Sequence, residues 1–176
     1  MSISTIKDLF LHELQDLYYA ENQIAKAIPD MMKKATEPAL FDRLEHHLDE
    51  TRELVGRLEQ IFKALGQEPK GVTCQAILGL LGEGDELARE IDNKQVLDTA
   101  LLASAQAIEH YEIVRYGTLI AWASQLGASA IVDKSALGGL DIVDLLQLSL
   151  DEQKAQDAGL TALAESKVNR HMPHSQ

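Results

Sequence analysis

Four long segments of this chain repeat apolar residues at spacings of three and four, and this pattern limits the fold more than any other feature. Such spacing places the apolar side chains along one face of an α-helix. No segment alternates apolar and polar residues in the way that is typical of a β-strand. Helices joined by short turns pack as antiparallel neighbours, so the sequence predicts an all-α fold, a bundle of four long helices.

The first two helices are expected to form a hairpin. The first spans about residues 3–34, with Thr5 or Ser4 as its N-cap. Pro29 lies inside this pattern, where it removes one backbone hydrogen bond, so we expect a kink there, or a helix that stops and restarts. The second helix is expected from residue 37 or 38 to residue 65, after Thr36 as its cap.

A long connection separates this hairpin from the other two helices. Residues 66–94 contain several glycines and an interrupted apolar stripe, which favours one short helix inside a crossover. The third long helix is expected at 94–126 and the fourth at 141–168, capped by Asp141, with a loop or short helical turn at 128–141 between them. We therefore expect one domain, residues 1–168, followed by a flexible polar tail at 169–176.

Composition narrows the classes of function. The chain has 176 residues, 45% of them hydrophobic, which is enough for the core of one domain. Its formal net charge of -12 argues against nucleic acid or an anionic membrane as the main partner. No run of 18 apolar residues is present, the N-terminus lacks the pattern of a signal peptide, and Cys74 is the single cysteine. We expect a cytoplasmic protein.

Carboxylates on apolar helix faces are the anomaly in the pattern. Glu109 and Glu112 lie three residues apart among apolar neighbours of the third helix, and Glu21 takes a position of the first seam where leucine is expected. Glu50 and Glu152 lie at a similar depth in the second and fourth helices. A buried carboxylate costs several kcal/mol unless it is paired, protonated or bound to metal.

Five carboxylates in one dry layer indicate a cation between them. Oxygen ligands suit iron or manganese, and bundle cores of the ferritin type hold dinuclear sites built from such glutamates. His47, three residues before Glu50, is a further candidate ligand, although the usual Glu-x-x-His order is absent here and in the fourth helix. The sequence thus predicts a metal site of Glu21, Glu50, Glu109, Glu112, Glu152 and His47, with two iron ions, or manganese, per chain.

Less specific interpretations stay open for each residue. Most acidic side chains are solvated, and Glu152 lies in the polar run DEQKAQD, where a solvated position is the more common outcome. His47 adjoins His46, and neighbouring histidines on a helix are often merely polar. The alternative function is therefore a metal-free structural or interaction bundle that acts through a protein partner.

Tyr116, one turn from Glu112, is the tyrosine expected to hydrogen-bond a ligand.

Several stretches together resemble the YciF/YciE stress-protein family of ferritin-like proteins. They are DLFLHELQDLYYAENQIAKAIPDM, HLDETRELVGRLEQIF, AIEHYEIVRYGTLIAWASQLG and DEQKAQDAGLTALA, with Cys74 in the crossover. The resemblance implies a ferritin-like bundle, often a homodimer, with a dinuclear metal site formed by the residues named above. It also implies a link to stress responses, with ferroxidase or peroxide-reducing chemistry. The region 128–150 is longer, by roughly ten residues, than this resemblance leads us to expect, and IVDKSALGGLD reads as an insertion.

Overall fold

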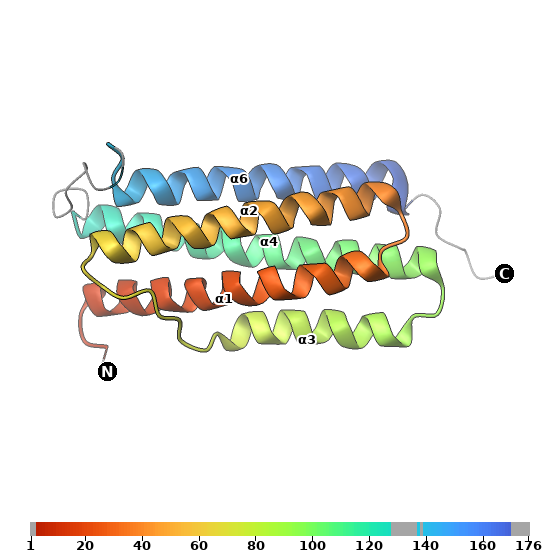
Figure 1. Cartoon of the computed structure of the whole chain (residues 1–176), viewed down its shortest axis with the longest axis horizontal. Coiled ribbons are helices and arrows are strands. Elements are labelled where there is room, and N and C mark those ends of the chain that lie inside the picture. The colour runs from red at the N-terminus through yellow and green to blue at the C-terminus, as the bar shows by residue number, and fades with distance from the viewer. Residues whose placement is uncertain (1–2, 128–136, 138, 170–176) are drawn as a thin grey trace.

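The computed structural model describes residues 3–127, 137 and 139–169, and every regular element in these ranges is helical. The elements are α1 (Ile6–Lys34), α2 (Pro38–Ala64), α3 (Gln75–Glu90), α4 (Lys94–Gln125), α6 (Ile142–Leu163) and a π-helical turn η2 (Ala164–Val168). The predicted fold is confirmed: four long helices lie side by side, and the shorter α3 packs along α1 and α4 (Figure 1). The expected loop at 128–141 and the tail fall largely outside the described residues.

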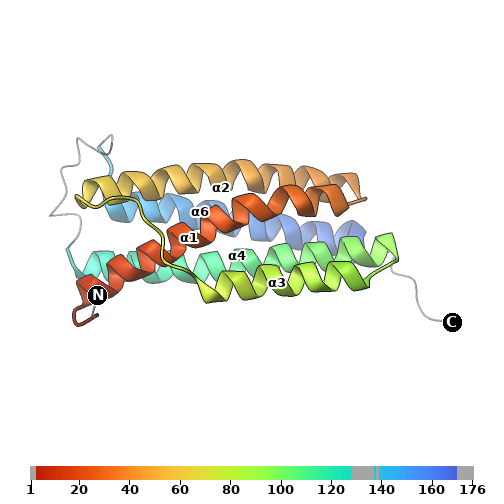
Figure 2. The same cartoon turned by 60° about the horizontal axis from the view of Figure 1, so that its bottom comes forward.

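The crossover sets the direction of each helix. In Figure 1, α1 and α6 run one way while α2 and α4 run the opposite way. Figure 2 shows that the connection after α2 crosses α1 before α3 begins, so α3 returns the chain to the far end of the bundle. Because α4 then starts beside the α1–α2 turn, α2 and α4 are parallel. This topology lets α1, α2, α4 and α6 each present one face to a shared interior.

Local signals set most helix ends. Thr5 caps α1 in a capping box with Asp8, and Asp141 caps α6 in the same way with Asp144, as expected. Gly66 and Gly127 follow α2 and α4 with φ of +66° and +63°, a backbone conformation that favours glycine.

The alternative of a helix that stops and restarts at Pro29 is ruled out, because α1 continues there without a break, and the expected kink stays a prediction. The expected cap of α2 was wrong. Glu37, not Thr36, caps α2. Thr36 instead donates its hydroxyl and its amide to Asp98 on α4, at 2.5 and 2.7 Å, and the amide of Glu37 donates to the same carboxylate at 2.9 Å. The buried Asp98 thereby ties the α1–α2 turn to the start of α4.

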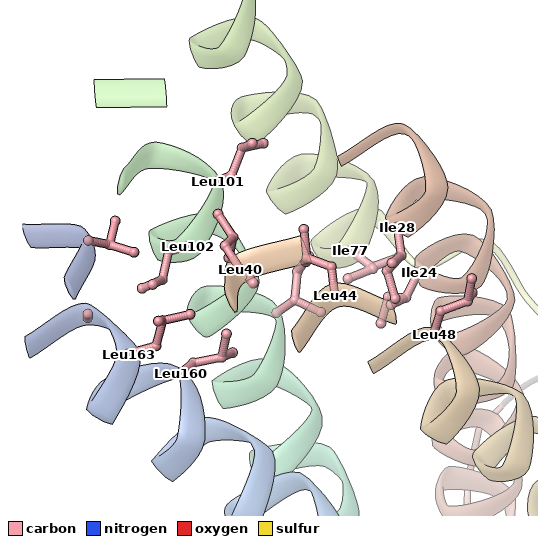
Figure 3. Close-up of a cluster of buried hydrophobic side chains, with 14 of the residues drawn as sticks. Ile24, Ile28, Leu40, Leu44, Leu48, Ile77, Leu101, Leu102, Leu160 and Leu163 are labelled. Carbon is pink, nitrogen blue, oxygen red and sulfur yellow. The ribbon is translucent and has the colours of Figure 1, made fainter. Parts of the chain in front are cut away.

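The interior consists of two apolar clusters, one toward each end of the bundle. One contains Phe10, Leu14, Leu17, Leu54, Leu58, Ile61, Phe62, Tyr116, Leu119, Ala123, Leu137, Ile142, Leu145, Leu146 and Leu150. The other, shown in part in Figure 3, contains Ala20, Ile24, Ile28, Leu40, Leu44, Leu48, Cys74, Ile77, Leu101, Leu102, Ala105, Ile108, Leu160, Leu163, Ala164 and Val168. On each of the four long helices, the residues of one cluster precede those of the other along the chain. The clusters therefore enclose a layer at mid-length.

Candidate metal centre

Buried polar side chains from all four long helices fill the layer between the apolar clusters. They are Glu21 on α1, His47 and Thr51 on α2, Glu109 and Glu112 on α4, and Gln153 and Gln156 on α6, each at most 2% exposed. Every one lies in the sequence between residues of the two clusters on its own helix. Such a concentration of polar groups in a dry core requires compensation by hydrogen bonds, protons or cations.

Three ligand atoms converge at the centre of this layer. His47 Nε2 lies 3.1 Å from Glu109 Oε1 and 3.8 Å from Glu112 Oε2. One donor atom from each of the three residues lies within 4.8 Å of the other two. Two donors that are each about 2.1 Å from one ion stand about 3–4 Å apart, so these spacings match the shell of a single cation.

The contacts among these atoms are not hydrogen bonds. His47 Nε2, both oxygens of Glu109 and both oxygens of Glu112 have no hydrogen-bond partner within the described part of the chain. The main-chain carbonyl of His47 accepts a bond from the Thr51 hydroxyl at 2.7 Å, which fixes the α2 backbone here. A 3.1 Å approach of an imidazole nitrogen to a carboxylate oxygen without hydrogen-bond geometry is compatible with two groups that share one cation.

Burial dominates the protonation of the cluster in the absence of metal. Burial, followed by the charges of Glu112 and Glu21, raises the pKa of Glu109 to about 11. Burial raises the pKa of Glu112 to about 8, although contacts with Glu21 and Gln153 act in the opposite direction. Burial lowers the pKa of His47 to about 4, so its imidazole is neutral at pH 7 and a ring nitrogen is available as a ligand.

Glu21 is oriented by Tyr116. The Tyr116 hydroxyl, fully buried on α4, donates a 2.8 Å hydrogen bond to Glu21 Oε1, while Glu21 Oε2 finds no partner among residues of the described ranges. Burial and the neighbouring Glu112 raise the pKa of Glu21 well above its usual value. Tyr116 thus holds one oxygen of Glu21 and leaves the other without a partner in the described residues. The hydrogen bond expected from Tyr116 to a candidate ligand is present, and the role of Glu21 as a ligand stays a prediction.

Glu50 connects the layer to the surface. Its Oε1 lies 3.2 Å from Nε2 of His46, a side chain that is 57% exposed. Its Oε2 is buried, with no hydrogen-bond partner in the described residues. Burial is the main cause that raises the pKa of Glu50, and Glu152 nearby raises it further. Glu50 therefore lies at the rim of the cluster and not at its centre.

Glu152 is not brought into the central cluster. Its carboxylate is bound by Arg57 of α2 through two hydrogen bonds, 2.5 Å from Nη1 and 2.8 Å from Nη2. The side chains of Arg57 and Glu152 are 12% and 27% exposed, so this pair lies at the edge of the α2–α6 interface. The sequence-based assignment of Glu152 as a ligand stays a prediction, and the guanidinium of Arg57 competes with any metal for this carboxylate.

Gln153 takes the buried position on α6 that the sequence analysis gave to its neighbour. Its side chain is fully buried, and neither its amide oxygen nor its amide nitrogen has a hydrogen-bond partner within the described ranges. A signal was present: Leu146, Leu150 and Leu160 are buried on the same face, and Gln153 continues their helical spacing. The acidic residue at 152, which the sequence suggests as the ligand of this helix, lies one position away from this face.

The donor set fits a first-row transition metal. It combines carboxylate oxygens with one neutral imidazole nitrogen, a mixture suited to iron or manganese. The orphaned oxygens of three glutamates, each enclosed by apolar clusters on both sides, are the groups that a cation satisfies. Cys74 lies apart from this set, with its Sγ 3.0 Å from the Tyr111 hydroxyl, and the ligands are therefore of the hard oxygen and imidazole types.

No helix in the described ranges combines the length and apolar character needed to cross a membrane.

Comparison with known proteins relates the chain to other sequences over nearly its full length. The model of a family described as "Domain of unknown function (DUF892)" matches residues 5–172. Protein YciF of Escherichia coli (strain K12) is 36% identical over 171 residues, which are 97% of this chain and 96% of that protein.

Two solved structures superpose closely on this fold. The E. coli stress protein YciF matches with a TM-score of 0.83 and 35% identity, covering 96% of this chain and 99% of that one. YcfI from Rhodopseudomonas palustris, described as a proposed structural protein, matches with a TM-score of 0.83 and 51% identity, covering 91% of this chain and 95% of that one.

Proposed function

The chain belongs to the family described as a domain of unknown function (DUF892), which includes E. coli YciF, and we propose that it binds transition-metal ions in the core of its bundle. The ions proposed are iron, with manganese as the alternative. The observation that carries this proposal is the convergence of His47, Glu109 and Glu112, whose facing donor atoms lack hydrogen bonds. YciF is named a stress protein, and we extend a role in stress to this chain as part of the proposal.

The candidate ligands have separate parts in holding the ions. His47, Glu109 and Glu112 would hold the first ion, with Glu21, oriented by Tyr116, as a further ligand from α1. Glu50, whose buried Oε2 has no hydrogen-bond partner in the described residues, would supply a donor for a second ion. Four carboxylates carry four negative charges, which two divalent cations neutralise.

The surrounding residues set the conditions for redox chemistry. Held by these residues, two ferrous ions would supply the two electrons that, with two protons, reduce one hydrogen peroxide to two water molecules. The apolar clusters on either side exclude bulk water from the layer. The Tyr116 hydroxyl holds Glu21 in place, and Glu109 and Glu112 release their protons when a cation replaces them. Ferroxidase or peroxide-reducing activity is the activity that we propose.

Metal content tests the binding proposal directly. Protein purified from iron-supplemented cells, or reconstituted with Fe(II) without oxygen, should carry close to two metal ions per chain by elemental analysis. The variant Glu112→Ala should lose them and should be more stable than the metal-free parent, because one buried carboxylate is gone. Glu45→Ala, which changes an exposed glutamate of α2, is the matched control and should retain the metal.

A metal-free structural bundle is the second candidate. The observation that favours it is the raised pKa of Glu112 and Glu109, because protonated carboxyl groups allow the layer to remain folded without cations. Full-length protein that carries no metal, and whose melting temperature does not move with Fe(II) or Mn(II), would establish this alternative. The homodimer and the cytoplasmic location stay predictions, which light scattering and cell fractionation can test.

A further inference from the structure

Gln153 is a fully buried side chain of α6 in the layer, and neither of its polar atoms forms a hydrogen bond within the described part of the chain. Gln156, one turn further along α6, has similar burial but is satisfied, since it accepts from Arg43 Nη1 and donates to the Arg43 carbonyl, both at 3.2 Å. Leaving a primary amide unsatisfied in a dry core costs about 1–3 kcal/mol for each polar group. Within the described residues, the amide oxygen of Gln153 therefore has no protein donor, and its NH₂ group forms no hydrogen bond of good geometry although Glu112 lies near it.

Contacts on both sides of Gln153 fix its depth in the bundle. On α2, Arg57 reaches Ser149 and Glu152, whereas Arg43 reaches Gln156. Because α2 and α6 are antiparallel, Gln153 lies opposite the stretch of α2 between these two arginines, which carries His47 and Glu50. The contact of Gln153 with Glu112 places it against the α4 ligands as well. The amide thus borders the central cluster from the α6 side.

We propose that Gln153 is the donor that α6 contributes to the metal centre, with its amide oxygen toward the ion and its NH₂ group toward the carboxylate of Glu112. This inference rests on the proposed metal-binding function. An amide oxygen is a neutral ligand, so α6 completes the shell without adding to the charge of the four carboxylates. Gln153 thereby makes the centre selective for divalent over trivalent ions, whereas a fifth carboxylate would favour the trivalent state.

Two matched substitutions test the ligand role. Gln153→Met preserves the unbranched shape but removes both amide groups, and Gln156→Met makes the same change one turn away. We expect Gln153→Met to weaken Mn(II) binding at least about 10-fold by calorimetry and to change the electron paramagnetic resonance spectrum of bound Mn(II). Without metal the same variant should melt at a higher temperature than the parent. Gln156→Met should leave the Mn(II) affinity within about twofold of the parent, as expected for a residue outside the shell.

A change of charge tests the selectivity. Gln153→Glu keeps an oxygen ligand and adds one negative charge, so the ratio of Ga(III) to Mn(II) affinity should rise at least about 10-fold in competition measured by elemental analysis. The Gln153→Glu variant also tests the ligand role of Gln153 if Gln153→Met fails to fold. An unchanged ratio, or Mn(II) binding by Gln153→Met equal to that of the parent, overturns the role of Gln153 while metal binding by the protein stands. A parent protein that binds no metal overturns the proposed function and, with it, this inference.

Discussion

At the scale of single residues, the candidate centre contains two kinds of carboxylate. Some face its interior, and others are held at its edge. Glu109 and Glu112 on α4 are fully buried and unsatisfied, whereas Glu152 on α6 is held by two hydrogen bonds from Arg57. The distinction is chemical and not only geometric. A carboxylate already neutralised by a guanidinium gains little from a metal, whereas an orphaned carboxylate gains a great deal.

This contrast predicts different outcomes for two glutamates. Glu152→Gln should leave metal content unchanged, because its carboxylate already has a cation. It should lower the free energy of unfolding by about 1–2 kcal/mol, since the mostly buried Arg57 loses its charged partner. Urea denaturation and elemental analysis of the same preparation measure both quantities. A loss of metal in Glu152→Gln would instead restore Glu152 to the ligand set.

At the scale of helices, the crossover brings α4 parallel to α2 and so brings His47 to Glu109. It passes close over α1: a Cβ added at Gly71 would lie 2.8 Å from Tyr19 Cβ and 3.1 Å from Tyr19 Cα. The amide of Val72 donates to the carbonyl of Gln15 at 3.2 Å, which attaches the crossover to α1 at the same point. Glycine at position 71 is therefore required by the close approach of two backbones.

Two glycine substitutions separate this requirement from helix propensity. Gly71→Ala should destabilise the fold by about 1–3 kcal/mol, because the added methyl group meets the α1 backbone. Gly79→Ala, in the interior of α3 with open space around it, should stabilise the fold by about 0.5–1 kcal/mol. Denaturation curves for both variants supply the comparison. Equal effects of the two substitutions would show that the crossover is not tightly packed on α1.

The positions of the helices along the chain were largely predictable from the sequence. The face that each helix turns toward the interior was not. Apolar spacing and the caps Thr5 and Asp141 were enough to locate the long helices within a few residues. The residues that face the interior were harder to identify where two neighbouring lines of a helix are both apolar. On α2 one apolar line contains Leu44 and Leu58, a neighbouring line contains His47 and Leu54, and both lines face the core, whereas Phe41 on the first line is 39% exposed.

The same ambiguity explains which site residues could be found in advance. Glu21, Glu109 and Glu112 stand out because a charge interrupts an otherwise apolar line. Gln153 carries no charge and follows an acidic neighbour, so the pattern pointed one position away. The partners Arg57 and Asp98 could not be found from local spacing, because their contacts join residues far apart in the sequence.

At the scale of the whole molecule, the polar layer divides the core into two apolar parts, and stability depends on how that layer is neutralised. Without metal, the folded state keeps protons on Glu112 and Glu109, whose pKa values are raised to about 8 and about 11 by burial, while the unfolded chain has lost them. Folding therefore binds protons near neutral pH. The stability from these protons is complete below pH 4.5 and is lost as pH rises through the folded pKa values.

Chelator-treated protein should accordingly become less stable between pH 7 and pH 9, by about 1.4 kcal/mol per pH unit for each proton held. His47 acts in the opposite direction, because its folded pKa of about 4 lies below that of the unfolded chain, but its effect is confined to pH values below about 6.5. Urea denaturation at pH 7, 8 and 9 measures the slope. Saturation with Mn(II) should abolish it, since the cation then replaces the protons.

The hydrogen bonds of Asp98 affect how precisely His47 of α2 and Glu109 of α4 are aligned along the bundle axis. An axial shift of the first hairpin against α4 by half a helical turn, about 2.7 Å, would carry His47 away from Glu109. Asp98 accepts hydrogen bonds from Thr36 and Glu37 at one end of the bundle. These bonds fix the axial position of the first hairpin relative to α4.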